Sequence, residues 1–190
     1  MIETDARWVE RAREGDTAAF KRLVDAHARP LFALCERITR DAALAEDAVQ
    51  EALYKAWRGL AEFDGRAAFA TWLHRIAVNA ALEQLRRNAR HRHETTESTS
   101  AADDNADFLD GFGDEEPGPD EHAVGAQIGR RIQAQMQHLS ALERAAFVLR
   151  HHEGESLEHI SATLDLTVGQ SKQAIFRAVR KLRGALQPWR

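Results

Sequence analysis

An acidic stretch in the middle of the chain limits the folds that this sequence can adopt more than any other feature. Between positions 94 and 121 there are eleven Asp and Glu residues and no Lys or Arg, among many Ser, Thr, Gly and Pro residues. A segment of like charge with few apolar side chains cannot bury enough surface to offset the entropy lost on ordering. We therefore expect an acidic, flexible, disordered linker over residues 93–122, which separates one domain at 1–92 from another at 123–190.

The net charge of −4 conceals two basic domains, because so many of the acids lie in the linker. Six arginines between positions 66 and 92 are balanced by one acid, Glu83, and the residues after the linker also carry a basic excess. Two basic modules on an acidic linker indicate a polyanionic partner that is contacted at two places. In the free protein we expect the linker acids to compete with that partner for these basic faces, the alternative being a linker that only keeps the protein soluble.

The compartment follows from the cysteine content and from the apolar runs. A single cysteine, Cys35, can form neither an internal disulfide nor a cysteine-based zinc site. The N-terminus has no apolar signal core, and no run approaches the roughly 20 apolar residues that a membrane span needs. We expect a cytoplasmic protein without a membrane span.

Apolar residues recur at helical spacing along the whole chain, as they do from Leu44 to Ala56, and no segment alternates like a strand. We expect an all-α fold whose first domain is a bundle of four or five helices. Its last helix is expected from Ala67 to Arg90. The boundary signals are Gly15 with Asp16, Pro30 opening a helix, Asp41 as a cap, and Asp64 with Gly65 as a turn.

The second domain has the pattern of a helix-turn-helix between residues 156 and 183. A helix is expected after Ser140, with Gly154 as its stop, and Ser156 caps a short helix that follows. A tight turn at Asp165 leads to a second helix, whose start at Thr167 has capping-box spacing with Gln170. Short helices joined so closely cross steeply, which lifts the second one toward a major groove.

The two sides of that second helix differ in chemistry. Its buried side is expected to hold Val168, Ser171, Ile175, Ala178, Val179 and Leu182. Its other side carries Lys172, Gln173, Phe176, Arg177 and Arg180. These basic and amide groups can reach guanine, adenine and phosphate, and an exposed Phe suits a thymine methyl. A solvated basic face is the plainer interpretation, and the outward aromatic favours DNA.

Two stretches of the first domain resemble a known family. The segments AEDAVQEALYKAW, at 45–57, and FDGRAAFATWLHRIAVNAALEQLRR, at 63–87, resemble the promoter-melting domain of extracytoplasmic-function (ECF) RNA polymerase sigma factors. The segment TVGQSKQAIFRAVRKLR, at 167–183, resembles the promoter-reading domain of the same family. The resemblance covers both domains and implies the minimal two-domain type. It implies a protein that binds core RNA polymerase and directs it to promoters.

The resemblance also implies how the polymerase is bound. In the family, the helix matching 47–57 docks on the clamp coiled coil of the largest polymerase subunit. The matching residues here are Asp47, Gln50, Glu51, Leu53 and Trp57. Gln50, Leu53 and Trp57 have the spacing of one contact stripe, although Leu53 and Trp57 could instead belong to the bundle core.

Promoter DNA is the second partner that the resemblance implies. The helix-turn-helix residues named above would recognise the minus-thirty-five element. The first domain would bind the minus-ten element through basic, aromatic and amide residues, namely Arg66, Thr71, Trp72, His74, Arg75, Asn79 and Arg86, with Phe63 and Phe69 beside them. Trp72 could equally be a core aromatic. Ala174 stands where the family often has an Arg, so we expect a weaker phosphate contact there.

Catalytic and metal sites are not indicated. The nine histidines form no ligand motif, and His91, His93, His151 and His152 are expected in linker or loops. We expect no enzyme activity and no cofactor. Two other functions stay open, a dimeric helix-turn-helix repressor and an RNA-binding antitermination adaptor. Whether an anti-sigma factor controls the protein is also left open.

Overall fold

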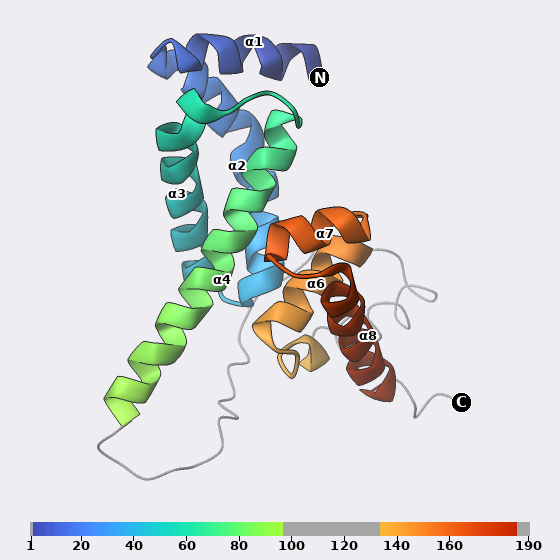
Figure 1. Cartoon of the computed structure of the whole chain (residues 1–190). Helices are drawn as coiled ribbons and strands as arrows, with labels where there is room; N and C mark the ends of the chain where they lie inside the picture. The colour runs from blue at the N-terminus through green and yellow to red at the C-terminus, as the bar shows by residue number, and fades with distance from the viewer. Residues whose placement is uncertain (1, 97–133, 186–190) are drawn as a thin grey trace, which may run out of the picture.

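The computed structural model describes residues 2–96 and 134–185, and both parts are helical (Figure 1). No strand occurs in either described range, which agrees with the expected all-α class. Among the described residues, no helix combines the length and the apolar character that crossing a membrane requires. Most of the acidic linker lies outside the described residues. The expectation that its acids compete for the basic faces concerns those residues and stays a prediction.

The N-terminal domain is a bundle in which α3 and α4 pack on each other and on α2, and α1 crosses one end (Figure 1). Its elements are α1 (Ile2–Arg13), α2 (Thr17–Thr39), α3 (Ala42–Gly59), the 3-10 turn η1 (Leu60–Glu62) and α4 (Phe69–Thr96). The helix α4 begins two residues later than expected. It also extends through residues 93–96, the first four residues of the expected linker.

Two of the expected caps in this domain are present. The side chain of Asp16 accepts hydrogen bonds from the backbone N–H groups of Ala18 and Ala19, at 2.9 and 3.0 Å, and so starts α2. Asp41 accepts a hydrogen bond from Leu44 and starts α3. These side chains satisfy N–H groups that have no partner within their own helices.

The prediction that Pro30 opens a helix was wrong, because Pro30 lies inside α2. A proline removes one backbone hydrogen bond and strains the preceding turn, which usually ends or kinks a helix. Here Leu23 lies before Pro30 and Leu31 and Leu34 lie after it, and all three are buried in one core. Their packing on both sides of the proline offsets its local cost.

The core of the bundle places large side chains of α2 against alanines of α3. Ala45, Ala48, Ala52 and Ala56 are all fully buried, which allows the neighbouring helices to approach α3 closely. The Sγ of Cys35 lies 3.8 Å from the carbonyl oxygen of Ala77 on α4. Burial raises the pKa of the Cys35 thiol to about 12, so this cysteine is a packing residue rather than a reactive one.

The C-terminal domain consists of α6 (Ala141–His151), α7 (Leu157–Leu164) and α8 (Val168–Ala185). Ser140 and Glu143 form a capping box at the start of α6, and Ser156 caps α7. Asp165 ends α7 in the left-handed region, with φ of +54°. The expected capping box of α8 is present too, since Thr167 donates to Gln170 Oε1 at 2.8 Å and the Gln170 N–H donates to Thr167 Oγ1 at 3.2 Å.

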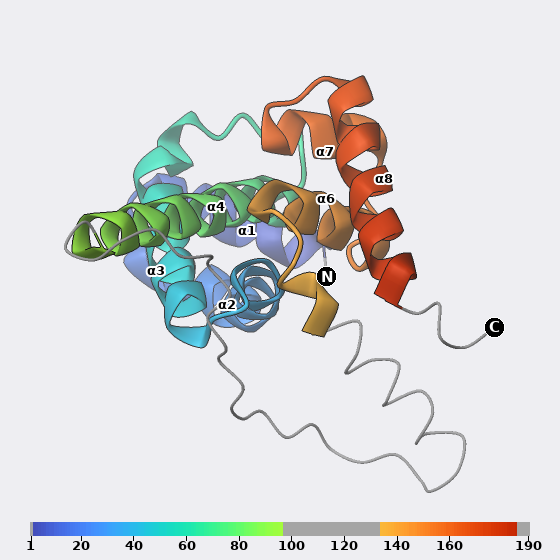
Figure 2. The same ribbon diagram turned by 90° about the horizontal axis from the view of Figure 1, so that it is seen from below.

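The two domains pack against each other. The helix α6 contacts α2 and α4, and α7 contacts α4, whereas α8 packs on α6 and α7, on the side away from the bundle (Figures 1 and 2). Buried apolar residues of both domains form one continuous cluster. The outer face of α8 is therefore free of the N-terminal domain, while parts of α2 and α4 are covered.

Candidate nucleic-acid interface

The angle between α7 and α8 is held by a buried pair of hydroxyl groups. Ser161 on α7 donates to the carbonyl oxygen of Leu157 at 2.6 Å, and its oxygen lies 3.0 Å from the Ser171 Oγ on α8. Because Ser161 uses its proton on Leu157, Ser171 is the donor between the two serines. Both are buried, so the pair fixes α8 on its supporting helix.

A second anchor ties α8 to α6. Lys181 Nζ lies 2.6 Å from Glu143 Oε2, and the same carboxylate caps the backbone N–H of Ser140. Burial alone would raise the pKa of Glu143, but the hydrogen bonds from Lys181 and Ser140 outweigh it and lower that pKa. The helix is thus presented to solvent on a rigid base.

The inward side of α8 differs from the prediction at two positions. Ser171, Ala178 and Leu182 are buried as expected, but Val168 is 38% exposed because it stands at the helix start. Ala174 is only 6% exposed and belongs to the core cluster. The expected weakening of a phosphate contact at Ala174 was therefore wrong, because this position faces the protein interior.

The outward side of α8 is as the sequence predicts. Phe176 is 65% exposed, an unusual state for a large aromatic side chain. The residues around it on the exposed side are Lys172, Gln173, Arg177 and Arg180. The face thus combines two kinds of group, cations for phosphate or guanine and an apolar ring for a base methyl group.

The outer side of α4 carries a second basic line. Arg75, Asn79 and Arg86 are all exposed, and their spacing of four and seven residues places them on one side of the helix. Arg66 lies in the loop before α4, where its side chain is almost fully exposed and pairs with Asp64 at 3.1 Å. These four predicted residues are accessible to a nucleic acid.

The aromatic residues near the start of α4 pack together instead. Trp72 lies 5.0 Å from the ring of Phe63 and 5.8 Å from that of Phe69, measured between ring centroids. Phe63 and Phe69 are buried, and Trp72 and Thr71 are partly buried. The interpretation of Trp72 as a core aromatic therefore holds for part of its surface, and Phe63 and Phe69 offer no face to a base.

His74 lies apart from the exposed line of α4, on the side that faces the C-terminal domain. Burial lowers the pKa of His74, the nearby acids Glu153 and Glu155 oppose this shift, and His27 and His159 add to it. The structure therefore separates His74 from Arg75 and Asn79, with which the sequence had grouped it.

The outward face of α3 differs from the predicted contact stripe. Asp47 and Gln50 are exposed, but Leu53 packs partly into the core, and the Trp57 ring lies 4.9 Å from that of Phe20. Tyr54, which the prediction missed, is 61% exposed. The alanine spacing of α3 was the available signal, because Tyr54 stands directly opposite the buried alanine side.

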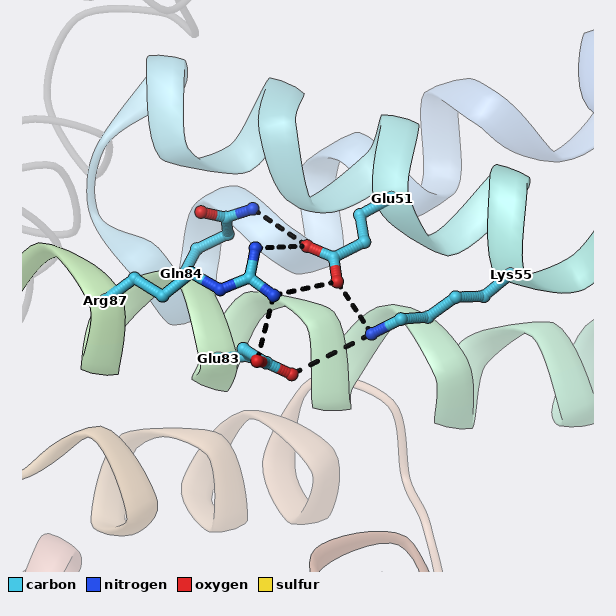
Figure 3. Close-up of polar contacts among 5 residues, drawn as sticks. All are labelled: Glu51, Lys55, Glu83, Gln84 and Arg87. Atoms are coloured by element: carbon cyan, nitrogen blue, oxygen red, sulfur yellow. Dashed lines mark hydrogen bonds and ion pairs between the residues drawn. The ribbon is translucent and has the colours of Figure 1, made fainter.

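Glu51 is engaged within the bundle, although it was predicted to face the polymerase (Figure 3). Its carboxylate accepts hydrogen bonds from Gln84 at 3.0 Å and from Arg87 at 3.1 Å, and it pairs with Lys55 at 2.7 Å. The hydrogen bond from Lys55 is the main reason why the pKa of Glu51 is lowered, and Arg87 contributes too. Arg87 also bonds to Glu83 at 2.9 Å, so the network joins α3 to α4.

Three of the four histidines expected in linker or loops lie in helices instead, and only His152 is in a loop as expected. His91 and His93 lie in α4 and His151 is the last residue of α6, while His152 lies in the turn that follows. Within the described ranges, no group of three or more His, Cys, Asp or Glu residues is arranged to hold a metal ion.

Comparison with known proteins decides what these two domains are. The family model for Sigma-70 region 2 matches residues 23–91, and the model for Sigma-70, region 4 matches residues 129–182. The chain is 37% identical to the RNA polymerase sigma-H factor of Pseudomonas aeruginosa over 98% of its own length and 95% of that protein. It is 33% identical to the ECF RNA polymerase sigma-E factor of Haemophilus influenzae, over 97% and 96%. The chain belongs to the ECF RNA polymerase sigma factors.

Solved structures agree with this fold. The sigma factor RpoE of Bartonella quintana, in complex with the anti-sigma factor NepR, matches with a TM-score of 0.68 and 23% identity, over 90% of this chain and 98% of that one. CnrH, in complex with the cytosolic domain of CnrY, matches with a TM-score of 0.63 and 23% identity, over 98% and 99%.

As an ECF sigma factor, the protein binds core RNA polymerase and directs it to promoters to start transcription. The region 2 match covers α3 and most of α2 and α4, and the region 4 match covers α6, α7 and most of α8. Family membership replaces the two other functions considered from the sequence, the dimeric repressor and the antitermination adaptor.

Proposed function

We propose that this ECF sigma factor divides its work among three helix faces. The outward face of α8 reads the minus-thirty-five element, the outer line of α4 holds the minus-ten element, and the outward face of α3 docks on the clamp coiled coil of the largest polymerase subunit. The observation that carries the proposal is Phe176, an aromatic ring left 65% exposed among cations on a firmly anchored helix.

On α8, each exposed side chain has a partner of matching chemistry. Gln173 can form paired hydrogen bonds with adenine, and Arg177 with guanine or a phosphate. Phe176 between them can cover a thymine methyl group. Lys172 and Arg180 lie at the ends of this face, where phosphates of the groove walls are in reach.

On α4, Arg75, Asn79 and Arg86 follow one line that fits a strand of DNA. The two arginines supply charge for the backbone, and the Asn79 amide can both donate to and accept from an unpaired base. Trp72 and Thr71 have only part of their surface available, so they serve at the edge of this line. His74 becomes available only when the C-terminal domain moves away.

On α3, the docking face consists of Asp47, Gln50 and Tyr54, which share the exposed side of the helix. Leu53 and Trp57 border this face and add apolar area at its rim. Glu51 acts indirectly, because its hydrogen bonds to α4 hold α3 in place. An exposed aromatic ring beside amide and carboxylate groups suits a helical partner.

The cellular setting follows from the polymerase. A sigma factor of this kind works in the cytoplasm, and it regulates a reaction that the polymerase catalyses. Two proteins of the same fold were solved with a bound partner, the sigma factor RpoE with the anti-sigma factor NepR and CnrH with the cytosolic domain of CnrY. We therefore include an anti-sigma factor among the partners of this chain.

Replacement of Arg177 by Ala tests the role of α8. The change should weaken binding to the upstream element by about 1–3 kcal/mol, because one charged contact to base or phosphate is lost. Binding to core polymerase should be unchanged. Electrophoretic mobility shifts with holoenzyme, and pull-downs with core enzyme alone, measure the two quantities. A parallel loss of both would show that α8 has a structural role instead.

The docking face is tested with the double variant Asp47→Ala and Gln50→Ala. Both side chains are exposed, so the thermal unfolding of the free protein should be nearly unchanged while core binding in a pull-down falls. The control is the double variant Glu10→Ala with Glu14→Ala, at exposed positions on α1 and in the turn that follows it. If the α3 variant assembles with core polymerase as well as the control does, α3 is not the docking helix.

A further inference from the structure

The connection between α6 and α7 carries two acids that lie against the N-terminal domain. Glu153 Oε1 is 3.6 Å from Arg37 Nη1 on α2. Glu153 and Glu155 are also the two acids close enough to His74 on α4 to act on its charge. One short acidic turn therefore faces a cation on α2 and a histidine on α4.

The fold holds these acids in place. The carbonyl oxygen of Glu155 accepts a hydrogen bond from Arg150 at 2.8 Å, and its carboxylate lies 2.7 Å from His159 Nδ1. The side chains of Glu153 and Glu155 are only 20% and 26% exposed. The helices on both sides of the turn contact α4, so the acids are fixed components of the domain interface.

The covered surface overlaps the surface that promoter DNA would use. His74 is among the residues assigned to the minus-ten element, and Arg37 adds a positive charge nearby. Two carboxylates beside an arginine and a histidine have the charge and the hydrogen-bonding capacity of nucleic-acid phosphates. The acidic turn thus occupies a position suited to a phosphate backbone.

We propose that the acidic turn at Glu153 and Glu155 is an internal competitor for promoter DNA, which covers the Arg37 and His74 surface in the free protein and leaves it when DNA is bound. This inference rests on the proposed function of α4. The two DNA-reading helices then differ in the free protein, because α8 faces outward while part of α4 is covered (Figures 1 and 2). The free protein is then able to present α8 before it presents the whole of α4.

Two kinds of contact hold the domains together, the charged contacts of the acidic turn and an apolar contact. Apolar residues of both domains share one buried cluster, so neutral side chains at the turn would still leave an apolar contact. Partly exposed ion pairs contribute modestly to stability. We therefore expect neutralisation to shift the balance between closed and open forms by roughly three- to tenfold, with both domains still folded.

The first experiment measures the distance between the domains in the full chain. Ala43→Cys on α3 and Ala162→Cys on α7 introduce spin labels at exposed positions, and the buried Cys35 does not compete for the label. Double electron–electron resonance then compares the E153Q/E155Q variant with the parent. The matched control, E10Q/E14Q at the C-terminal end of α1 and in the turn after it, changes the net charge equally at a distant site. The turn variant should show longer and broader distances, and the control should not.

The second experiment measures binding of the free protein to the single-stranded oligonucleotide dT20. The E153Q/E155Q variant should bind roughly three- to tenfold more tightly than the parent, and clearly more tightly than E10Q/E14Q. A separate R75A/N79A variant tests the proposed function itself, since it removes the α4 contacts and should weaken binding.

The outcomes separate the two ideas. If R75A/N79A weakens dT20 binding while E153Q/E155Q matches its control in distance and affinity, the competitor is refuted and the role of α4 stands. If the domains open but dT20 affinity does not rise above the control, the turn holds the domains together without competing for DNA, which also refutes the proposal. If R75A/N79A binds dT20 as tightly as the parent does, the proposed function of α4 is refuted, and the competitor proposal that rests on it is refuted too.

Discussion

Two exposed aromatic rings give the sharpest test of how the helix faces are divided. Phe176 on α8 is 65% exposed and Tyr54 on α3 is 61% exposed, so the two side chains are alike in size and accessibility. A buried aromatic side chain covers about 200 Å², so the exposed part of Phe176 is about 130 Å². At about 25 cal/mol per Å², full burial against DNA would contribute at most about 3 kcal/mol. We expect Phe176→Ala to cost about 1–3 kcal/mol of promoter binding, because a groove covers only part of the ring.

The same area explains why the folded state should tolerate the change. Only about a third of Phe176, about 70 Å², is buried in the free protein, so Phe176→Ala should lower the free energy of unfolding by at most about 2 kcal/mol. Tyr54→Ala should be similarly mild. Urea unfolding followed by circular dichroism measures both values.

The assay is a crossed comparison of the two variants. An upstream element is first selected from random DNA with wild-type holoenzyme, and binding of each variant to that element and to core polymerase is then titrated by fluorescence anisotropy. Phe176→Ala should lose promoter affinity and keep core affinity, and Tyr54→Ala should do the reverse. If both variants lose the same function, or if Phe176→Ala loses only stability, the assignment of the two faces is wrong.

Three further predictions concern the supports of these faces. Glu51→Gln should lower the free energy of unfolding by about 1–2 kcal/mol in urea, because its charge-assisted bonds to Lys55 and Arg87 are lost. Arg144→Met should raise the melting temperature by a few degrees, because burial and Arg40 lower the pKa of this enclosed guanidinium to about 10 and its Nε has no hydrogen-bond partner among the described residues. An unchanged or lower melting temperature would contradict this. The contact at His74 should be stable above the ordinary histidine pKa of 6.5 and weaken as the pH falls through the lowered pKa, because burial favours the neutral ring. Spin-label distances at pH 7.5 and 5.5 check that sign, and a closed form favoured by acid would reverse it.

Local signals predicted much of the secondary structure. Caps such as Asp16, Asp41 and Thr167 act through hydrogen bonds within one turn, so they can be identified from sequence alone. The exposed face of α8 was also predicted, because helical periodicity separates its basic from its apolar positions. The prediction that Pro30 opens a helix failed because the buried leucines before and after it outweigh the tendency of proline to end a helix.

The wrong predictions on α3 and α8 concern residues whose exposure depends on packing between helices. Leu53 and Tyr54 are adjacent, and only the direction of the alanine face decides which one is exposed. Glu51 has the polarity of a docking residue, but partners more than thirty residues away, on α4, engage it. Val168 is exposed because it stands at the start of α8, and Ala174 is buried because it lies on the same side of the helix as Ser171 and Ala178.

The contact between the domains was beyond prediction from sequence. It joins α2 and α4 to α6 and α7 across a long acidic linker, and no local pattern indicates which faces meet. The placement of His74 follows from this contact, which is why its separation from Arg75 was not foreseen.

Transcription reconstituted with core RNA polymerase tests the central claim most directly. Genomic DNA of the source organism is transcribed by core enzyme with and without this protein, and the 5′ ends of the transcripts are sequenced. The account predicts new start sites that follow two unlike DNA elements at a fixed spacing, with Arg177→Ala relaxing the upstream element and Asn79→Ala the downstream one. The absence of new start sites, or starts at which neither substitution changes the preferred sequence, would contradict it.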